Sequence, residues 1–456
     1  MKPFKRFALI LFAALVLLAL KPSSALAWQS ETAPTTESET PSRSSTTSPN
    51  APAEQATKTV TAYTLAPDLY EKTKHIDRVR LIFLIVSPIY SLLILWLFLG
   101  WKLGPRYRDW AEGASSKLFV QVVVFSPLLI LTLDILDLPV GVFEQWELRN
   151  YGLSVQRWGS WAWDWTKGEF VNVIIAIILI SILYAVLRKS PQRWWFYFWL
   201  AALPLGVLLI FLQPLVIDPL FHKFEPLQQK DPALTAALEH MVARAGQDIP
   251  PERMYWMNAS EKVNELNAYV TGIGGSKRIV VWDTTIAKMT TPQIVSVVGH
   301  EMGHYVLNHI PKALAIYALG SLALFYLGYR SIGWLLKWRG TRWGIRAPED
   351  LASLPALLLL FSIFLLILTP VTNAISRYFE HQADQYALEV THGLTPDSGQ
   401  VAAQAFQVLG EVDLEYPDPS RLDVLLTDDH PPTRDRVRFS LTYNPWANGG
   451  TGEFVH

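Results

Sequence analysis

Residues 351–372 read LASLPALLLLFSIFLLILTPVT and contain no ionisable side chain. A helix needs about 20 predominantly apolar residues to cross a bilayer, so this stretch predicts a transmembrane helix. The sequence that follows without a break, residues 373–387, reads NAISRYFEHQADQYA. It carries Glu380 and Asp384 four positions apart, the spacing that places two side chains on one face of a helix. Spacing alone favours two carboxylates on a solvated helix face, and a functional pair directly beyond a membrane span is the alternative that the metal motif below supports.

The composition extends this picture to the whole chain. Of the 456 residues, 50% are hydrophobic and only 17% are charged, whereas about a quarter of the residues in soluble proteins are charged. Further apolar segments long enough to span a bilayer lie at residues 80–101, 118–138, 170–187, 194–217 and 313–336. The pattern predicts a mainly α-helical, polytopic protein whose surroundings are the lipid bilayer.

Charge and cysteine content exclude several function classes. The formal net charge of −1 argues against bulk electrostatic binding of nucleic acid, so we expect no nucleic-acid partner. The sequence has no cysteine, which excludes disulfides, thiolate metal sites and cysteine nucleophiles.

The N-terminus has the layout of a secretory signal peptide. In residues 1–27, basic side chains precede an apolar stretch, and Ala25-Leu26-Ala27 fits a cleavage site. The alternative is an uncleaved first span, which raises the number of spans from six to seven. Residues 28–65 are rich in Ser, Thr, Pro, Glu and Ala and are expected to form a disordered linker. Both features are typical of a bacterial protein, and they predict an inner-membrane location.

The motif His300-Glu301-Met302-Gly303-His304 carries the strongest chemical signal. Histidines at i and i+4 lie one turn apart on a helix, so both imidazoles reach one zinc ion at about 2.0–2.1 Å. In H-E-x-x-H sites the glutamate is the general base that activates the attacking water. The helix is itself predicted, because Thr290 and Thr291 offer an N-cap and Pro292 suits the first helical position.

A catalytic zinc ion needs a third protein ligand and an open position for water. Glu380 is the expected ligand, and Asp384 is expected to hydrogen-bond a ligand histidine and fix its tautomer. His381 is the alternative ligand, but it faces about 100° away from Glu380 on a helix. His309, nine residues beyond His300, is expected to be structural. One zinc ion per chain is the expected cofactor.

Two domains follow from this pattern. Residues 66–217 hold four spans and form an N-terminal transmembrane domain. Residues 218–456 form a zinc metallopeptidase domain that is interrupted by two spans, at about 313–336 and 351–372. Lys and Arg near the spans number fourteen on one face and seven on the face that carries the metal motifs. The positive-inside rule therefore predicts that the zinc domain lies outside the cytoplasm.

Four blocks of sequence, taken in order, resemble the type I CAAX prenyl proteases, which are integral-membrane zinc metallopeptidases. The resemblance covers roughly residues 65–440. The blocks are Asp218 to Phe224; Asn267 to Tyr269 with Lys277 to Thr284; the helix from His300 to His309; and Ser376 to Asp384, followed by His430-Pro431-Pro432 and Arg436.

The resemblance implies a fold in which the spans enclose a chamber, with zinc at one end in a zincin-type domain that has a small β-sheet edge. It implies that His300, His304 and Glu380 bind the zinc ion and that Glu301 is the catalytic base. In eukaryotic members of the family the zinc domain lies on the cytosolic side, opposite to the side predicted by the charge count.

The resemblance also implies residues that bind the substrate. Asn267 and Ala268 are expected on an edge strand that hydrogen-bonds an extended peptide backbone. His430 and Arg436 are expected to face the site, where a cation or donor stabilises the oxyanion of peptide hydrolysis. His430 is therefore expected to be catalytic, and Arg436 is expected to contact the substrate.

The main hypothesis is a membrane-embedded zinc endopeptidase that acts on a peptide or protein, with C-terminal prenylation left open. Because bacteria generally lack protein prenylation, a quality-control membrane protease without prenyl specificity is one alternative. A non-enzymatic chamber or carrier protein with a structural metal is the alternative from another class. Structural zinc is usually ligated fully by protein, so three ligands and an adjacent glutamate favour catalysis.

Overall fold

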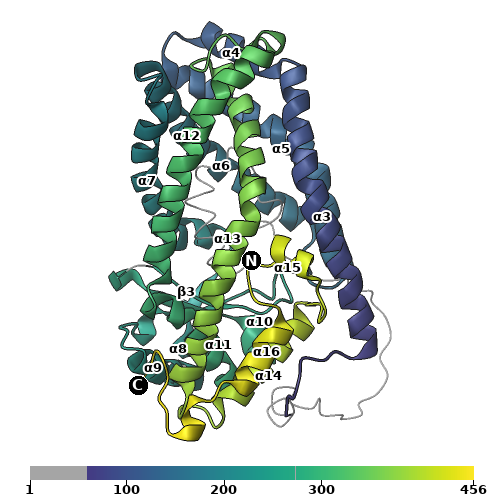
Figure 1. The fold of residues 1–456 in the computed structure, drawn as a ribbon, viewed down its shortest axis with the longest axis vertical. Coiled ribbons are helices and arrows are strands. Elements are labelled where there is room, and N and C mark those ends of the chain that lie inside the picture. The colour runs from purple at the N-terminus through teal and green to yellow at the C-terminus, as the bar shows by residue number, and fades with distance from the viewer. Residues whose placement is uncertain (1–58, 273, 456) are drawn as a thin grey trace.

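The structure is a computed structural model that describes residues 59–272 and 274–455. The signal-like segment 1–27 and most of the predicted linker lie outside these residues. Within them, six helices are long and apolar enough to cross a membrane, as the sequence predicted. These helices run along the long axis of the molecule, and the strands and most of the shorter helices gather at one end, here called the peptidase end (Figure 1).

Except for α7 (Trp194–Leu212), the helices of the candidate spans are longer than the apolar runs that predicted them. Their helices are α3 (Pro67–Gly100), α5 (Leu118–Asn150), α6 (Trp158–Lys189), α7 (Trp194–Leu212), α12 (His309–Trp343) and α13 (Leu354–Thr391). Hydropathy marks the part of a helix that suits lipid, whereas the backbone hydrogen bonds continue beyond it. The added first turns of α6 are anchored by Asp164, which accepts a hydrogen bond from Lys262 Nζ at 2.7 Å.

Among the described residues, four strands form one mixed sheet in the order β1-β2-β4-β3. The strands are β1 (Phe224–Pro226), β2 (Met254–Met257), β3 (Ala268–Thr271) and β4 (Arg278–Trp282). β1 and β2 pair antiparallel, β2 and β4 pair parallel, and β3 pairs antiparallel with β4, so that Ala268 stands opposite Val281. β3 is therefore the edge strand that the sequence predicted, and one row of its backbone polar groups faces away from the sheet.

Shorter helices complete the peptidase end around one apolar core. They are α8 (Leu227–Lys230), α9 (Pro232–Arg244), α10 (Asp283–Lys288), α11 (Thr291–Val306), α14 (Ser398–Val412), α15 (Arg421–Leu426) and α16 (Thr433–Thr442). Leu238 of α9, Val281 of β4 and Val298 of α11 are completely buried in this core. The predicted N-cap of α11 is present, because Thr290 donates its backbone N–H to Gln293 Oε1 at 2.8 Å.

α13 joins the membrane part to the peptidase end. Of its apolar window 72% is buried inside the protein, against 17% for α3, so α13 is the most enclosed of the six candidate spans. It continues without a break into the peptidase end (Figure 1). There α11 crosses it closely because Gly303 faces it: a Cβ on Gly303 would lie 3.2 Å from Cα of Ala383. This crossing brings the two predicted metal motifs together.

The last residues of the predicted linker pack on the peptidase end, which corrects the linker boundary. Gln400 of α14 accepts from the N–H of Val60 at 2.7 Å and donates to its carbonyl at 3.0 Å, and Gln407 holds Thr64 in the same way. Tyr63 is buried between them. Composition alone missed this contact because the partner lies more than 300 residues away in sequence. The chain therefore enters α3 from the peptidase end.

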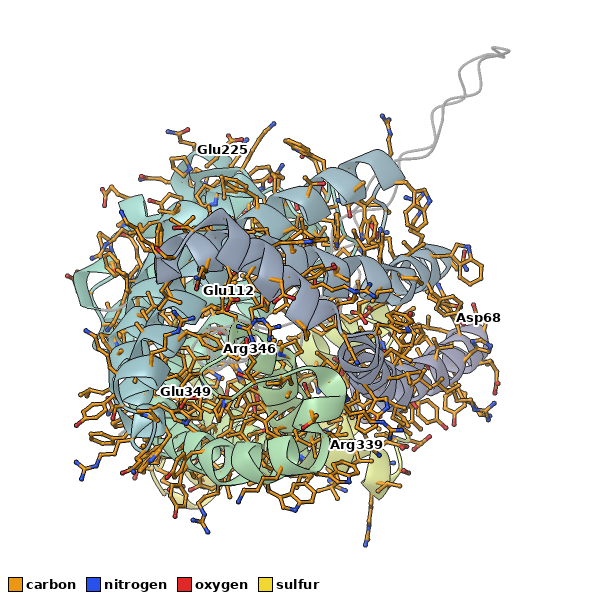
Figure 2. All side chains as sticks on the ribbon, turned by 90° about the horizontal axis from the view of Figure 1, so that it is seen from above. Asp68, Glu112, Glu225, Arg339, Arg346 and Glu349 are labelled. Carbon is orange, nitrogen blue, oxygen red and sulfur yellow. The ribbon has the colours of Figure 1, made fainter. Side chains whose placement is uncertain are left out.

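Ion pairs fasten the opposite end of the molecule. The short helix α4 (Leu103–Ala114) lies there and pairs with the loop between α12 and α13. Arg108 Nη1 donates to Asp350 Oδ2 at 2.6 Å in a buried pair, and Arg346 donates to Glu112 at 2.7 Å on the surface (Figure 2). The basic loops that the charge count grouped together include these residues, and they are distant from the metal motifs.

Candidate metal centre

Three potential ligand atoms converge at the crossing of α11 and α13. Nε2 of His300 lies 3.3 Å from Nε2 of His304 and 3.1 Å from Oε2 of Glu380. Nε2 of His304 lies 3.6 Å from Oε1 of Glu380. All three side chains are buried, and their ligand atoms lie within 4.8 Å of one another. The structure thus brings together the three residues that the sequence selected as ligands.

The chemistry of this donor set fits zinc. Two imidazole nitrogens and one carboxylate match the ligands of catalytic zinc sites that have three protein ligands. Burial lowers the pKa of His304 to about 3, so its imidazole is neutral, which is the form that binds a metal. Burial also opposes a charge on His300, but the carboxylates of Asp384 and Glu380 raise its pKa to about 9. These two carboxylates therefore favour a positive charge beside His300.

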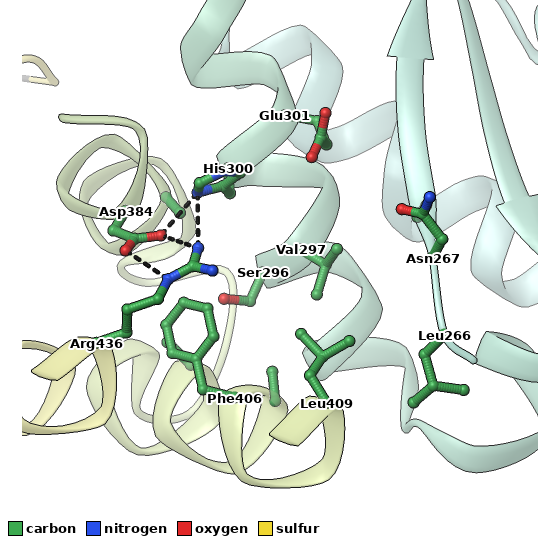
Figure 3. A pocket seen from close by; sticks show the side chains of 14 residues that line it. Leu266, Asn267, Ser296, Val297, His300, Glu301, Asp384, Phe406, Leu409 and Arg436 are labelled. Carbon is green, nitrogen blue, oxygen red and sulfur yellow. Dashed lines mark hydrogen bonds and ion pairs between the residues drawn. The ribbon is translucent and has the colours of Figure 1, made fainter. Parts of the chain in front are cut away.

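Asp384 lies behind His300, on the side away from the other ligands. Its Oδ1 is 2.7 Å from Nδ1 of His300, and its Oδ2 accepts from Arg436 Nε at 2.8 Å (Figure 3). With this acceptor, His300 carries its proton on Nδ1 and presents Nε2 to the ligand group. Such geometry is what a residue that fixes the tautomer of a ligand requires.

Arg436 lines the pocket beside His300 and is also bound to Asp384. Both Nε and Nη2 of its guanidinium bond to Asp384, and the guanidinium stacks over the Phe406 ring at 4.1 Å. The side chain is buried, at 6% exposure. The geometry therefore gives Arg436 a role in holding Asp384, and its place in the pocket lining leaves its expected contact with substrate a prediction. Sequence reasoning missed this pairing because 52 residues separate the two partners.

Glu301 and His430 flank the ligands from two elements. Glu301 follows His300 on α11 and lines the pocket described below (Figure 3). His430 lies in the loop before α16, and its Nε2 is 2.8 Å from Oε2 of Glu380, while its Nδ1 is 2.9 Å from Asp429. Both side chains that the sequence selected as catalytic therefore border the ligand group.

Two other histidines differ in their distance from the ligands. His381 lies away from them, with its ring packed on Phe439 at 4.5 Å, so the alternative third ligand does not join the group. His309 was expected to be structural, yet its Nδ1 lies 3.1 Å from Nδ1 of His304. Asn308, at φ +56°, turns the chain between α11 and α12 and produces this contact. The sequence spacing held no sign of that turn.

A pocket lies beside His300 and Glu301 (Figure 3). Its volume is about 540 Å³, which includes solvent space at its opening. Asn267 and Ala268, at the start of β3, form one side of it. Its apolar wall includes Leu266, Val297, Phe406 and Leu409. An extended peptide paired with the edge of β3 would pass the ligand group and place an apolar side chain in this pocket.

The family comparisons agree with this architecture. Residues 228–442 match the sequence model of peptidase family M48. Residues 51–223 match the model described as the CAAX prenyl protease N-terminal region with five membrane helices. The first match begins at residue 228, and the second ends at residue 223.

Individual relatives support the same assignment. The chain is 36% identical over 333 residues to the uncharacterized metalloprotease YhfN of Bacillus subtilis (strain 168), covering 73% of this chain and 76% of that protein. It is 25% identical over 348 residues to CAAX prenyl protease 1 of Saccharomyces cerevisiae, covering 70% and 75%. Its fold is similar to the crystal structure of S. mikatae Ste24p, with a TM-score of 0.73, 24% identity, and coverage of 83% and 90%. The predicted fold class is thereby confirmed.

Proposed function

This chain belongs to peptidase family M48, and we propose that it is a membrane endopeptidase in which His300, His304 and Glu380 hold one zinc ion and Glu301 is the catalytic base. That it is a membrane metalloprotease follows from the family. One observation carries the assignment of residues: the three ligand atoms converge within 4.8 Å, and Glu301 lines the adjoining pocket.

The residues of the chain divide the work of peptide hydrolysis. Zinc, when bound, polarises the scissile carbonyl and lowers the pKa of water. Glu301 takes the proton of the attacking water and passes it to the leaving amine. Asp384 keeps His300 in its Nδ1–H form, and Arg436 holds Asp384 in place. His430 donates a hydrogen bond toward the oxyanion once its Nε2 turns away from Glu380 Oε2, and β3 binds the extended peptide backbone.

The test is cleavage of a mixed peptide pool by the detergent-purified full chain, read by mass. The pool contains farnesylated and unmodified C-terminal peptides. We expect cuts that disappear with a chelator and return with zinc. Dependence on the farnesyl group supports CAAX processing, and independence supports a quality-control protease. Zinc bound at one ion per chain without any cut would refute the peptidase and favour a carrier with a structural metal.

Narrowing the pocket is expected to change which peptides are cut. Val297 is half-buried on α11 and lines the pocket, so Val297→Phe is expected to narrow it. Peptides with Leu or Phe next to the scissile bond are expected to lose about 10–200-fold in kcat/KM, and those with Ala are expected to lose little. A competition assay read by mass measures this ratio. An equal loss for all peptides would contradict the assignment of the pocket.

We propose that the zinc domain faces the non-cytoplasmic side of a bacterial inner membrane. The charge count supports this side, and so does the contact of Val60 with α14, because a signal-like segment directs the sequence after it across the membrane. The natural absence of cysteine allows single-cysteine labelling. In spheroplasts, an impermeant maleimide is expected to label Asp248→Cys at the peptidase end and not Ser116→Cys at the other end. The reverse pattern would place the zinc domain in the cytoplasm.

A further inference from the structure

His309 connects a proposed metal ligand to a polar side chain on α13. Its Nδ1 lies 3.1 Å from Nδ1 of His304, and its Nε2 lies 3.1 Å from Oε1 of Gln382. The ring has no exposed surface and stacks on Phe379, with centroids 4.6 Å apart and planes 16° apart. A ring held by packing on its face and by contacts at both nitrogens has one available orientation.

The groups at the two ends of this row, the ligand group and the Gln382 amide, decide which nitrogen of each histidine carries the proton. Nε2 of His304 faces the ligand group, so the proton of that imidazole is on Nδ1. Nδ1 of His309 must then accept, which places the proton of His309 on Nε2. The amide oxygen of Gln382 accepts that proton's hydrogen bond. Every donor in the row meets an acceptor, and no member needs a charge.

We propose that His309 is a positioning residue that holds His304 in the metal-binding tautomer. It does so through an uncharged row of hydrogen bonds from His304 through His309 to Gln382, here called the relay. This inference rests on the proposed metal site. The relay gives the two ligand histidines unlike partners, since His300 is held by the Asp384 carboxylate. A neutral partner behind His304 leaves less negative charge around the metal, and so preserves its strength as a Lewis acid.

The test compares zinc dissociation constants of full-length variants, measured by competition with a chelator. His309→Phe keeps an aromatic ring on Phe379 but removes the acceptor, and it is expected to weaken zinc binding about 10–100-fold. His309→Asn places its side-chain oxygen near the position of Nδ1 and is expected to retain most of the affinity. Unchanged affinity in His309→Phe would overturn the proposal. An equal loss in both variants would mark His309 as a packing residue and would overturn it as well.

A second pair of variants tests the far end of the relay, even if His309→Phe fails to fold. Gln382→Leu removes the final acceptor and is expected to weaken zinc binding, while Gln382→Glu restores an acceptor and recovers affinity. Gln385→Leu is the matched control, because Gln385 is also half-buried on α13 but contacts Glu389 and Tyr443 instead. Equal zinc affinities in Gln382→Leu and the control would overturn the relay. A wild-type chain that binds no zinc would instead refute the proposed metal site.

Discussion

Glu301→Gln is expected to lower kcat by about 10²–10⁴-fold while one zinc ion stays bound per chain. The amide keeps the size and shape of the carboxylate but does not accept a proton from the attacking water. Because Glu301 is not among the three converging ligands, the metal site keeps its donors. Cleavage rates and zinc content are measured on the same purified sample, so that loss of turnover is separated from loss of metal.

The matched control for this experiment is Glu252→Gln. Glu252 is exposed in the turn before β2 and is not among the residues that line the pocket. The control is expected to keep wild-type kcat and zinc content. Normal turnover in Glu301→Gln would remove this residue from the mechanism, and loss of zinc together with turnover would assign it to the metal site instead.

Glu380→Gln is expected to weaken zinc binding strongly. Loss of a residue that only hydrogen-bonds a metal ligand lowers metal affinity by about 10–100-fold, and loss of a ligand is expected to lower it further. The substitution removes the only anionic side chain among the three proposed ligands and leaves the two imidazoles as the remaining proposed donors. Turnover is expected to fall with the metal content. Chelator competition gives the affinity, and the rise of Tm with added zinc gives an independent measure, because a ligand stabilises the folded state that binds it.

Glu389→Gln provides a control on the same helix. Glu389 is buried on α13, but it accepts hydrogen bonds from the backbone N–H groups of Glu453, Phe454 and Val455 and lies outside the ligand group. Its variant is expected to loosen the C-terminal segment and to leave the zinc dissociation constant unchanged. Equal zinc affinity in Glu380→Gln and Glu389→Gln would show that Glu380 is not a ligand.

Local patterns predicted the elements that carry the chemistry. The i, i+4 spacing placed His300 with His304 and Glu380 with Asp384, because helical periodicity is a property of neighbouring residues. Hydropathy located the spans for the same reason. It did not locate the ends of α5 and α6, since those ends are stabilised by contacts with the peptidase end rather than by lipid.

Contacts between distant residues lay beyond the reach of local patterns. The pairing of Arg436 with Asp384 and the clamp of Gln400 on Val60 each join segments far apart in sequence. The position of His309 depends on one left-handed residue, Asn308, and a single φ angle leaves no signature in hydropathy or spacing. Only the assembled fold reveals these partners.

The peptidase end cannot be separated from the membrane spans by cutting the chain at one point, because the last two candidate spans lie between its metal motifs. The histidines precede α12, and Glu380 arrives at the far end of α13, about 39 Å along the helix from Leu354 at about 1.5 Å per residue. Along the chain, the two parts of the proposed ligand set are therefore connected only through two candidate spans. A soluble fragment would lose either a ligand or the helix that positions it. The proposed metal centre therefore forms only in a chain that carries both of these spans.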